Sequence, residues 1–133
     1  EFRKVMENDI MELILLHYDE NEEERAELAQ NVKELKSLKA SPDSTTDDFA
    51  KNDTEFHKLL GKASKNLLLE RIYSCVIDFL NPSIKYIHSS ENKGANSETA
   101  HSEMLEAIEK RDKEMAAKAV ECASVSWANV MDR

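Results

Sequence analysis

The stretch Phe49-Ala-Lys-Asn-Asp-Thr-Glu-Phe-His-Lys-Leu-Leu60 decides the fold and also holds an unusual pair of polar residues. Phe49, Phe56 and Leu60 recur at helical spacing, so we expect a helix with one face in an apolar core. Asp53 and His57 fall on that same face, one turn apart. Because a buried carboxylate or imidazole needs a partner, the pair is predicted to contact each other, a metal ion or a bound acid.

Similar apolar periodicity continues on both sides of this stretch. It predicts helices at about 2–17, 22–39, 42–62 and 67–88, then from 97 to a break at Arg111-Asp112, and from there onward. Pro82 removes a backbone donor, so the fourth helix is expected to kink or break near Leu80. Since short loops place consecutive helices antiparallel, the predicted fold is an all-α antiparallel bundle of six or seven helices.

The composition narrows the class of protein. A length of 133 residues suits one domain, and 34% charged with only 6% aromatic residues is typical of a helical bundle. The net charge of −9 argues against a chain that grips nucleic acid by itself. Two cysteines form no disulfide framework, and no apolar run approaches the roughly 20 residues of a membrane helix, so a cytoplasmic protein without membrane contact is expected.

Other residues extend the candidate site beyond Asp53 and His57. His101 is in register with the apolar face of its helix and should point inward. One Asp and two His provide the donors of a Zn²⁺, Ni²⁺ or Mn²⁺ site, although an Asp-His hydrogen bond is the simpler structural alternative. Cys75 and Asp78 lie on the helix expected to line the same cavity. His17 and His88 lie at helix ends and are expected at the surface.

The order of several short motifs carries a resemblance. These motifs are Glu1-x-Arg3-x3-Glu7, Asp53-x2-Phe56-His57, Leu60-x2-Ala63-Ser64-x-Asn66, and His101 followed by Ala107-Ile108-x2-Arg111-Asp112. Together they resemble the C-terminal effector domain of FadR-like regulators in the GntR family of bacterial transcription factors. The resemblance covers essentially the whole chain.

The resemblance implies a function as well as a fold. The whole chain, 1–133, would be an effector-binding and dimerisation domain without catalytic activity. A winged helix-turn-helix domain would precede residue 1 and make the contact with DNA. The domain would form a homodimer and bind a small organic or sugar acid, and this binding would alter how the DNA-binding domains are presented.

The resemblance also implies a metal site, which this chain matches only in part. Many members hold a divalent metal through one Asp and three His; Asp53, His57 and His101 match three of these positions, and the fourth is Ala123. Cys122 and Ser124 are each rotated by about 100° on the helix and do not replace it. Two alternatives therefore remain. In one, water or the effector completes the coordination of a metal held by Asp53, His57 and His101; in the other, the pocket binds no metal.

The effector itself would be held by a wider set of residues. The arginine that matches Arg3 points toward the pocket in the family, where a guanidinium can grip a carboxylate with two hydrogen bonds; a solvated surface arginine is the alternative. The predicted effector-binding residues are Arg3, Asp53, His57, His101, Cys75 and Asp78.

Two further hypotheses belong to other functional classes. In the first, the chain is a structural helical dimerisation module whose pocket has decayed, which the alanine at position 123 favours. In the second, Glu98-x2-His101 belongs to a metal-dependent helical-bundle enzyme. Di-iron bundles need two such Glu-x2-His pairs and two more Glu, and the sequence has a single pair.

Overall fold

The computed structural model describes residues 2–89 and 95–131, with side chains described for 2–89 and 97–125. This part of the chain is all helical, without a strand, which confirms the predicted fold class. The six helices are α1 (Phe2–Leu16), α2 (Glu22–Ala40), α3 (Thr46–Ala63), α4 (Leu67–Ser89), α5 (Ala95–Glu109) and α6 (Lys113–Met131). None of them is long and apolar enough to cross a membrane.

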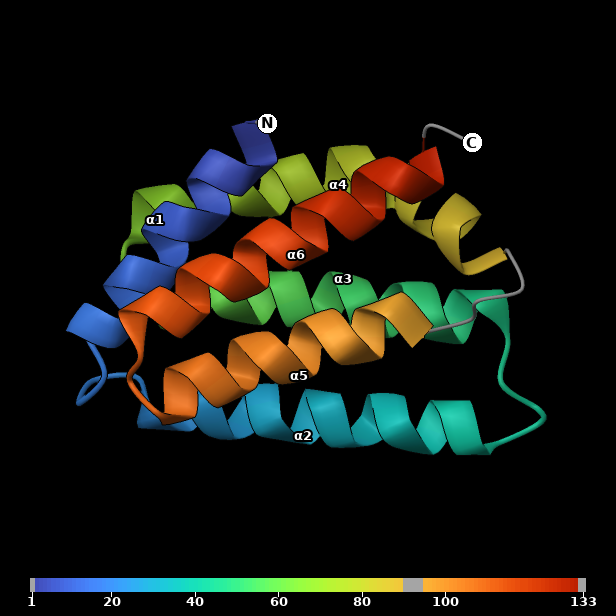
Figure 1. Ribbon diagram of the computed structural model, residues 1–133, viewed down its shortest axis with the longest axis horizontal. Helices are drawn as coiled ribbons and strands as arrows, with labels where there is room; N and C mark the ends of the chain where they lie inside the picture. Colours follow the sequence, from blue (N-terminus) through green and yellow to red (C-terminus); the bar gives the residue numbers. More distant parts are fainter. Residues whose placement is uncertain (1, 90–94, 132–133) are drawn as a thin grey trace.

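The helices alternate in direction along the long axis of the bundle (Figure 1). The closest neighbours are α3 with α4, α2 with α3, α2 with α5, α5 with α6, and α1 with α6. Contacts of α1 with α3 and α4 complete the bundle. In this arrangement α3 lies inside, so its inward face meets residues from several other helices.

Local signals explain where helix α3 begins and where α3 and α5 end. Helix α3 begins after Thr45, whose hydroxyl accepts from the backbone of Asp48 while the Asp48 carboxylate accepts from the backbone of Thr45. The expected start near Pro42 was therefore too early. Lys65 and Arg111 take positive φ values of 57° and 52°, which end α3 and α5 in tight turns. These turns return α4 and α6 antiparallel to their predecessors.

Helix α4 continues through Pro82 to Ser89 and is not split. The alternative of a seventh helix at this proline is therefore wrong. Because the helix continues for two more turns, its last turn reaches the first half of α3. There the ring of His88 stacks on the ring of Phe49, with centroids 6.0 Å apart.

The core includes the apolar face that the periodicity predicted for α3. Phe49, Phe56 and Leu60 are at most 3% exposed; Phe56 and Leu60 pack with residues of the other helices, and Phe49 stacks on His88 of α4. Buried polar residues interrupt this core on the same face of α3, and they define the site described next.

Candidate metal and effector site

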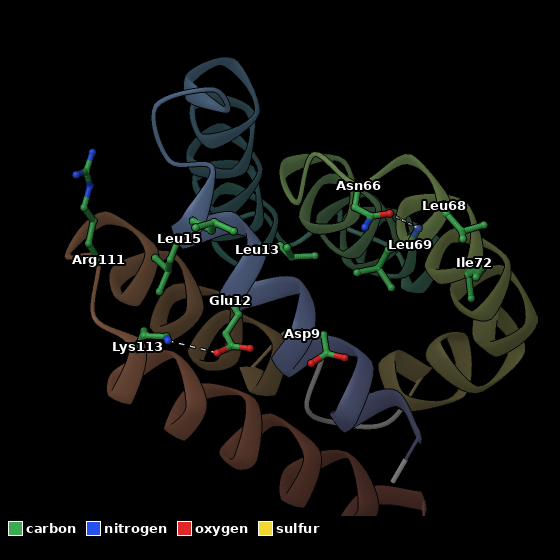
Figure 2. A pocket seen from close by; sticks show the side chains of 11 residues that line it. Asp9, Glu12, Leu13, Leu15, Asn66, Leu68, Leu69, Ile72, Arg111 and Lys113 are labelled. Carbon is green, nitrogen blue, oxygen red and sulfur yellow. Dashed lines mark hydrogen bonds and ion pairs between the residues drawn. The ribbon is translucent and has the colours of Figure 1, made fainter.

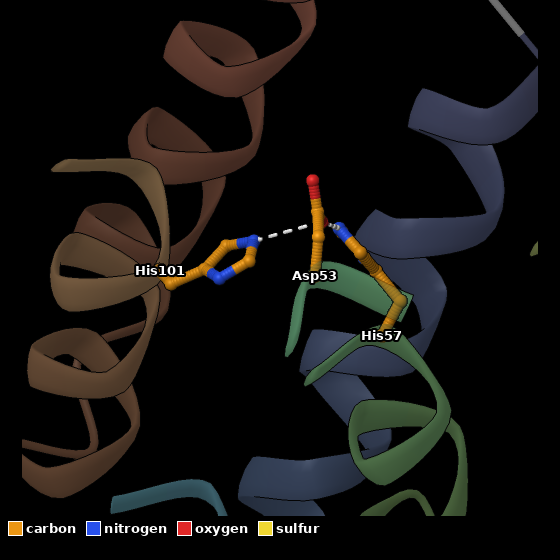
Figure 3. A group of neighbouring side chains, drawn as sticks. All are labelled: Asp53, His57 and His101. Carbon is orange, nitrogen blue, oxygen red and sulfur yellow. Dashed lines mark ion pairs between the residues drawn. The ribbon is translucent and has the colours of Figure 1, made fainter. Parts of the chain in front are cut away.

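Three imidazole rings surround the carboxylate of Asp53. Its Oδ1 lies 3.1 Å from Nε2 of His57 and 3.3 Å from Nε2 of His101. Figure 3 draws these two contacts as dashed lines. Its Oδ2 lies 2.8 Å from Nε2 of His88. The carboxylate and His57 come from α3, His101 from α5 and His88 from the last turn of α4. Each imidazole is only 2% exposed, so the cluster belongs to the core.

His57 is fixed by a closed ring of hydrogen bonds on the side facing α1. Nη2 of Arg3 lies 3.0 Å from Nε2 of His57, and Nδ1 of His57 lies 2.7 Å from the hydroxyl of Tyr73. Tyr73 donates to Oε1 of Glu7 at 2.8 Å, and Nε of Arg3 donates to the same oxygen at 2.8 Å. Because a guanidinium can only donate, Nε2 of His57 accepts and its Nδ1 carries the hydrogen.

This tautomer has a consequence for the charge around Asp53. The Nε2 lone pair of His57 lies beside a carboxylate oxygen 3.1 Å away, and two electron-rich atoms repel at that distance. A positive group must offset the repulsion, and Arg3 provides one in this structure. The position therefore favours a cation, either a guanidinium or a metal ion.

His101 is oriented by stacking rather than by a second hydrogen bond. Its ring lies parallel to that of Phe56, with centroids 3.8 Å apart and planes at 7°. Its Nδ1 is buried and has no hydrogen-bond partner among the described residues. The stack on Phe56 thereby directs Nε2 at Asp53.

Burial and the neighbouring groups shift the pKa values of Asp53 and His101 in opposite directions. Burial alone would raise the pKa of Asp53, but hydrogen bonds from His101 and His88 hold it well below its ordinary range. Burial lowers the pKa of His101, which outweighs the attraction of Asp53. The site thus joins an ionised carboxylate to a neutral imidazole, the protonation states that metal binding requires.

Burial and charge also shift the pKa values of Arg3 and Glu7, the ion pair on α1, in opposite directions. Burial would raise the pKa of Glu7, yet the charge of Arg3 lowers it. Burial would lower the pKa of Arg3, yet the attraction of Glu7 raises it. Both side chains are therefore charged, and they form a partly buried pair one turn apart on α1.

The expectation that His88 lies at the surface is wrong. The sequence shows a histidine near the end of a helix, but the continuation of α4 through Pro82 carries it into the core. Ser97, at the start of α5, lies 3.4 Å from both Oδ2 of Asp53 and Nε2 of His88. Helical periodicity offered one clue, because His88 is four residues after the buried Ile84.

The comparisons with known proteins identify the family of this chain. A family model described as the FCD domain matches residues 1–122. The chain belongs to the FCD domain family. FCD domains are the C-terminal domains of FadR-like regulators in the GntR family, so the resemblance drawn from the motifs is confirmed. No curated protein and no solved structure matches the chain in the other two comparisons.

Some predicted site residues lie apart from the cluster of this FCD domain. Cys75 is exposed, and Asp78 is exposed and pairs with Lys58 at 2.7 Å. Neither is brought to Asp53. Ala123 on α6 is half-buried and packs against the core. Arg3, Asp53, His57 and His101 are brought together.

The donor set of Asp53, His57 and His101 fits a divalent metal. One ligand atom from each lies within 4.8 Å of the others. Metal–ligand bonds of about 2.0–2.2 Å place adjacent ligand atoms roughly 3.0–3.5 Å apart, and the two separations to Oδ1 are 3.1 and 3.3 Å. The three side chains thus offer one carboxylate and two imidazole donors to a single ion.

A separate groove lies between α1 and the start of α4, where α5 turns into α6. Its volume is about 800 Å³, and Figure 2 shows the leucine side chains of α1 and α4 that line it. The lining residues are Asp9, Glu12, Leu13, Leu15, Leu16, Asn66, Leu68, Leu69, Ile72, Arg111 and Lys113. None of the predicted effector-binding residues belongs to this groove.

Proposed function

We propose that this FCD domain is the sensing part of a GntR-family transcription regulator. A small organic or sugar acid binds at the Asp53 cluster and thereby controls the DNA binding of a winged helix-turn-helix domain that precedes residue 1. The observation that carries this proposal is that Arg3, Asp53 and the buried imidazoles of His57 and His101 converge on one point. The regulator acts in the cytoplasm, where its DNA is found.

Asp53, His57 and His101 would hold Zn²⁺, Ni²⁺ or Mn²⁺. A bound ion supplies positive charge and free coordination positions for the carboxylate of the effector. Nε2 of His57 and Nε2 of His101 lie 3.1 and 3.3 Å from Oδ1 of Asp53, which supports a site made from these three donors. With Ala123 at the family's fourth position, this FCD domain leaves one more position to water or to the acid.

Arg3 is suited to hold the acid itself. Its guanidinium lies beside His57, and an incoming carboxylate can accept two hydrogen bonds from it. The acid would then replace His57 as a partner of Arg3, which belongs to the first turn of α1. Because α1 is the helix nearest to the proposed DNA-binding domain in sequence, this exchange provides a route from the pocket to DNA binding.

The two alternative functions have less support. The Glu98 carboxylate of the proposed di-iron motif forms an ion pair with Lys39 at 2.5 Å instead of joining His101. A decayed pocket is expected to fill with apolar side chains, whereas Asp53 here is surrounded by three imidazoles. Both features favour a binding site without catalysis.

We also propose that the domain forms a homodimer. Large apolar side chains are exposed at helical spacing on α4, with Leu68 70%, Ile72 44% and Phe79 83% exposed. Such a stripe is what a second copy of the chain would cover. Light scattering should give the mass of a dimer for the native chain and of a monomer for the Phe79→Lys variant.

A thermal-shift screen tests the sensing function. The purified domain, supplied with Zn²⁺, Ni²⁺ or Mn²⁺, is heated with a panel of organic and sugar acids and with the uncharged amide of each. We expect at least one acid, but not its amide, to raise the melting temperature, and the increase to vanish in the His101→Ala variant. A panel that leaves every melting temperature unchanged would argue for the structural module.

A further inference from the structure

The two oxygens of the Asp53 carboxylate have different partners, and this division assigns a role to His88. Oδ1 faces the Nε2 atoms of His57 and His101, the two histidines of the proposed metal site. Oδ2 faces His88 at 2.8 Å and Ser97 at 3.4 Å. The His88 contact is the shortest of the three imidazole contacts of Asp53.

His88 is held where it can donate to Oδ2. Its ring is 2% exposed and stacks on Phe49 at 20° between planes. Phe49 lies one turn before Asp53 on α3, so the same helix carries both the carboxylate and the support of its partner. The ring therefore has little freedom to turn its Nε2–H away from Asp53.

A carboxylate fixed at one oxygen presents the other in a constant direction. An aspartate side chain can rotate about its last bond and expose either oxygen, and this freedom costs entropy when a ligand binds. A donor at Oδ2 removes that freedom and leaves Oδ1 between His57 and His101. Groups that hold metal ligands in this way commonly contribute about 10–100-fold to metal affinity.

We propose that His88 is a positioning residue of the site, which holds Oδ2 of Asp53 so that Oδ1 is presented to His57, His101 and a bound divalent metal. Ser97 assists at the same oxygen. His88 itself is not a metal ligand, because it contacts the oxygen turned away from the other two imidazoles. This inference rests on the metal site of the proposed function.

The test compares metal affinity in variants that separate the hydrogen bond from the packing. His88→Phe keeps an aromatic ring against Phe49 and removes the donor, while His88→Gln keeps an N–H at a similar reach. His17→Phe is the matched control, since it removes an imidazole from the end of α1 without touching Asp53. Zn²⁺ affinity is measured by competition with a chromophoric chelator, and circular dichroism reports the helix content of each variant.

We expect His88→Phe to bind Zn²⁺ about 10–100-fold more weakly than the native protein. His88→Gln should recover most of this loss, and His17→Phe should match the native protein. An unchanged affinity in His88→Phe would overturn the inference while leaving the metal site of Asp53, His57 and His101 intact. No Zn²⁺, Ni²⁺ or Mn²⁺ binding by the native protein would overturn both.

X-ray absorption of the Zn²⁺ complex decides between positioning and ligation, because it counts coordinated imidazoles. The inference predicts two imidazoles in the native protein and two in His88→Gln. Three in the native protein and two in the variant would mean that His88 replaces the histidine absent at Ala123, which contradicts a positioning role. If His88→Phe loses its helix content, the inference is tested by the number of coordinated imidazoles in the native protein and in His88→Gln.

Discussion

Nη2 of Arg3 lies 3.0 Å from Nε2 of His57, the same nitrogen that faces Asp53 and would bind a metal. A guanidinium and a metal ion cannot both use that lone pair. In the proposed function, metal binding would therefore move Arg3 away from His57, and an acid that attracts Arg3 would favour the same movement. The proposal thus predicts a second arrangement of the first turn of α1, selected by what the site binds.

Replacing Arg3 by Met should strengthen metal binding. The variant frees the lone pair of His57 and removes a buried positive charge, so Zn²⁺ affinity should rise on the order of tenfold, while binding of an acid effector should weaken. Lys4→Met is the control, since it removes the same charge from α1 at a side chain that pairs with Glu121 of α6 and not with His57. Titration calorimetry measures both affinities. Equal gains in the two variants would mean that net charge alone is responsible.

Removing Arg3 should also leave Glu7 buried without its cation. Breaking a buried ion pair typically costs about 3–5 kcal/mol, whereas neutralising both partners costs less. Arg3→Met should therefore lower the free energy of unfolding by roughly this amount, and adding Glu7→Gln should recover part of it. Urea denaturation measures the free energy of unfolding of the native protein, of Arg3→Met and of the double variant. A double variant less stable than Arg3→Met would contradict the pairing.

The pH dependence of stability follows from the lowered pKa values of Glu7 and Asp53. A carboxyl with a pKa lower in the folded than in the unfolded state stabilises the fold above its unfolded pKa, which is near 4, and loses that contribution as the pH falls. The metal-free domain should thus lose stability below about pH 5. Glu7→Gln should show a shallower loss in denaturant titrations between pH 7 and pH 3.5. Identical slopes in both proteins would assign the loss to other groups.

The hydroxyl of Tyr73 joins His57 to Glu7, so Tyr73→Phe should affect both stability and metal binding. Without it, Nδ1–H of His57 loses its acceptor at 2.7 Å, which should cost about 1–3 kcal/mol of unfolding free energy. Metal affinity should fall by about tenfold because the His57 ring is less well oriented. Tyr86→Phe, at an exposed position, is the control. Denaturation and Zn²⁺ titration of the two variants give the comparison.

Ala123→His should raise metal affinity, since it restores the histidine that the family carries at the matching position. Ala117→His places an imidazole on an exposed part of the same helix and should have no effect. Zn²⁺ titration measures the metal affinity of both variants and thereby tests which face of α6 is turned toward the site. No gain from Ala123→His would mean that position 123 does not face the pocket.

Periodicity was sufficient to predict the bundle and the inward face of α3. Phe56, His57 and Leu60 are buried as their spacing requires, because a helix with one apolar stripe has a single way to bury it. His101 was likewise predicted from its register with Met104 and Ile108. The part of the site that lies on regular helices, away from their ends, could therefore be inferred from the chain alone.

What the sequence could not provide depends on contacts between distant segments. The role of His88 requires that α4 pass through Pro82 without a break, a local choice that tertiary packing decides. The ring that links Arg3, Glu7, Tyr73 and His57 joins residues up to 66 positions apart. Cys75 and Asp78 share α4 with Tyr73 but lie on its exposed side, since helix membership alone does not fix the facing direction.

The most direct test of the proposed site is the metal content of the purified domain, prepared without chelator, beside the Asp53→Ala variant. We expect close to one equivalent of Zn, Ni or Mn in the native protein. The variant should lose this metal and keep its helix content. An equal metal content in both proteins, or none in either after titration with all three ions, would contradict a metal site built on Asp53, His57 and His101.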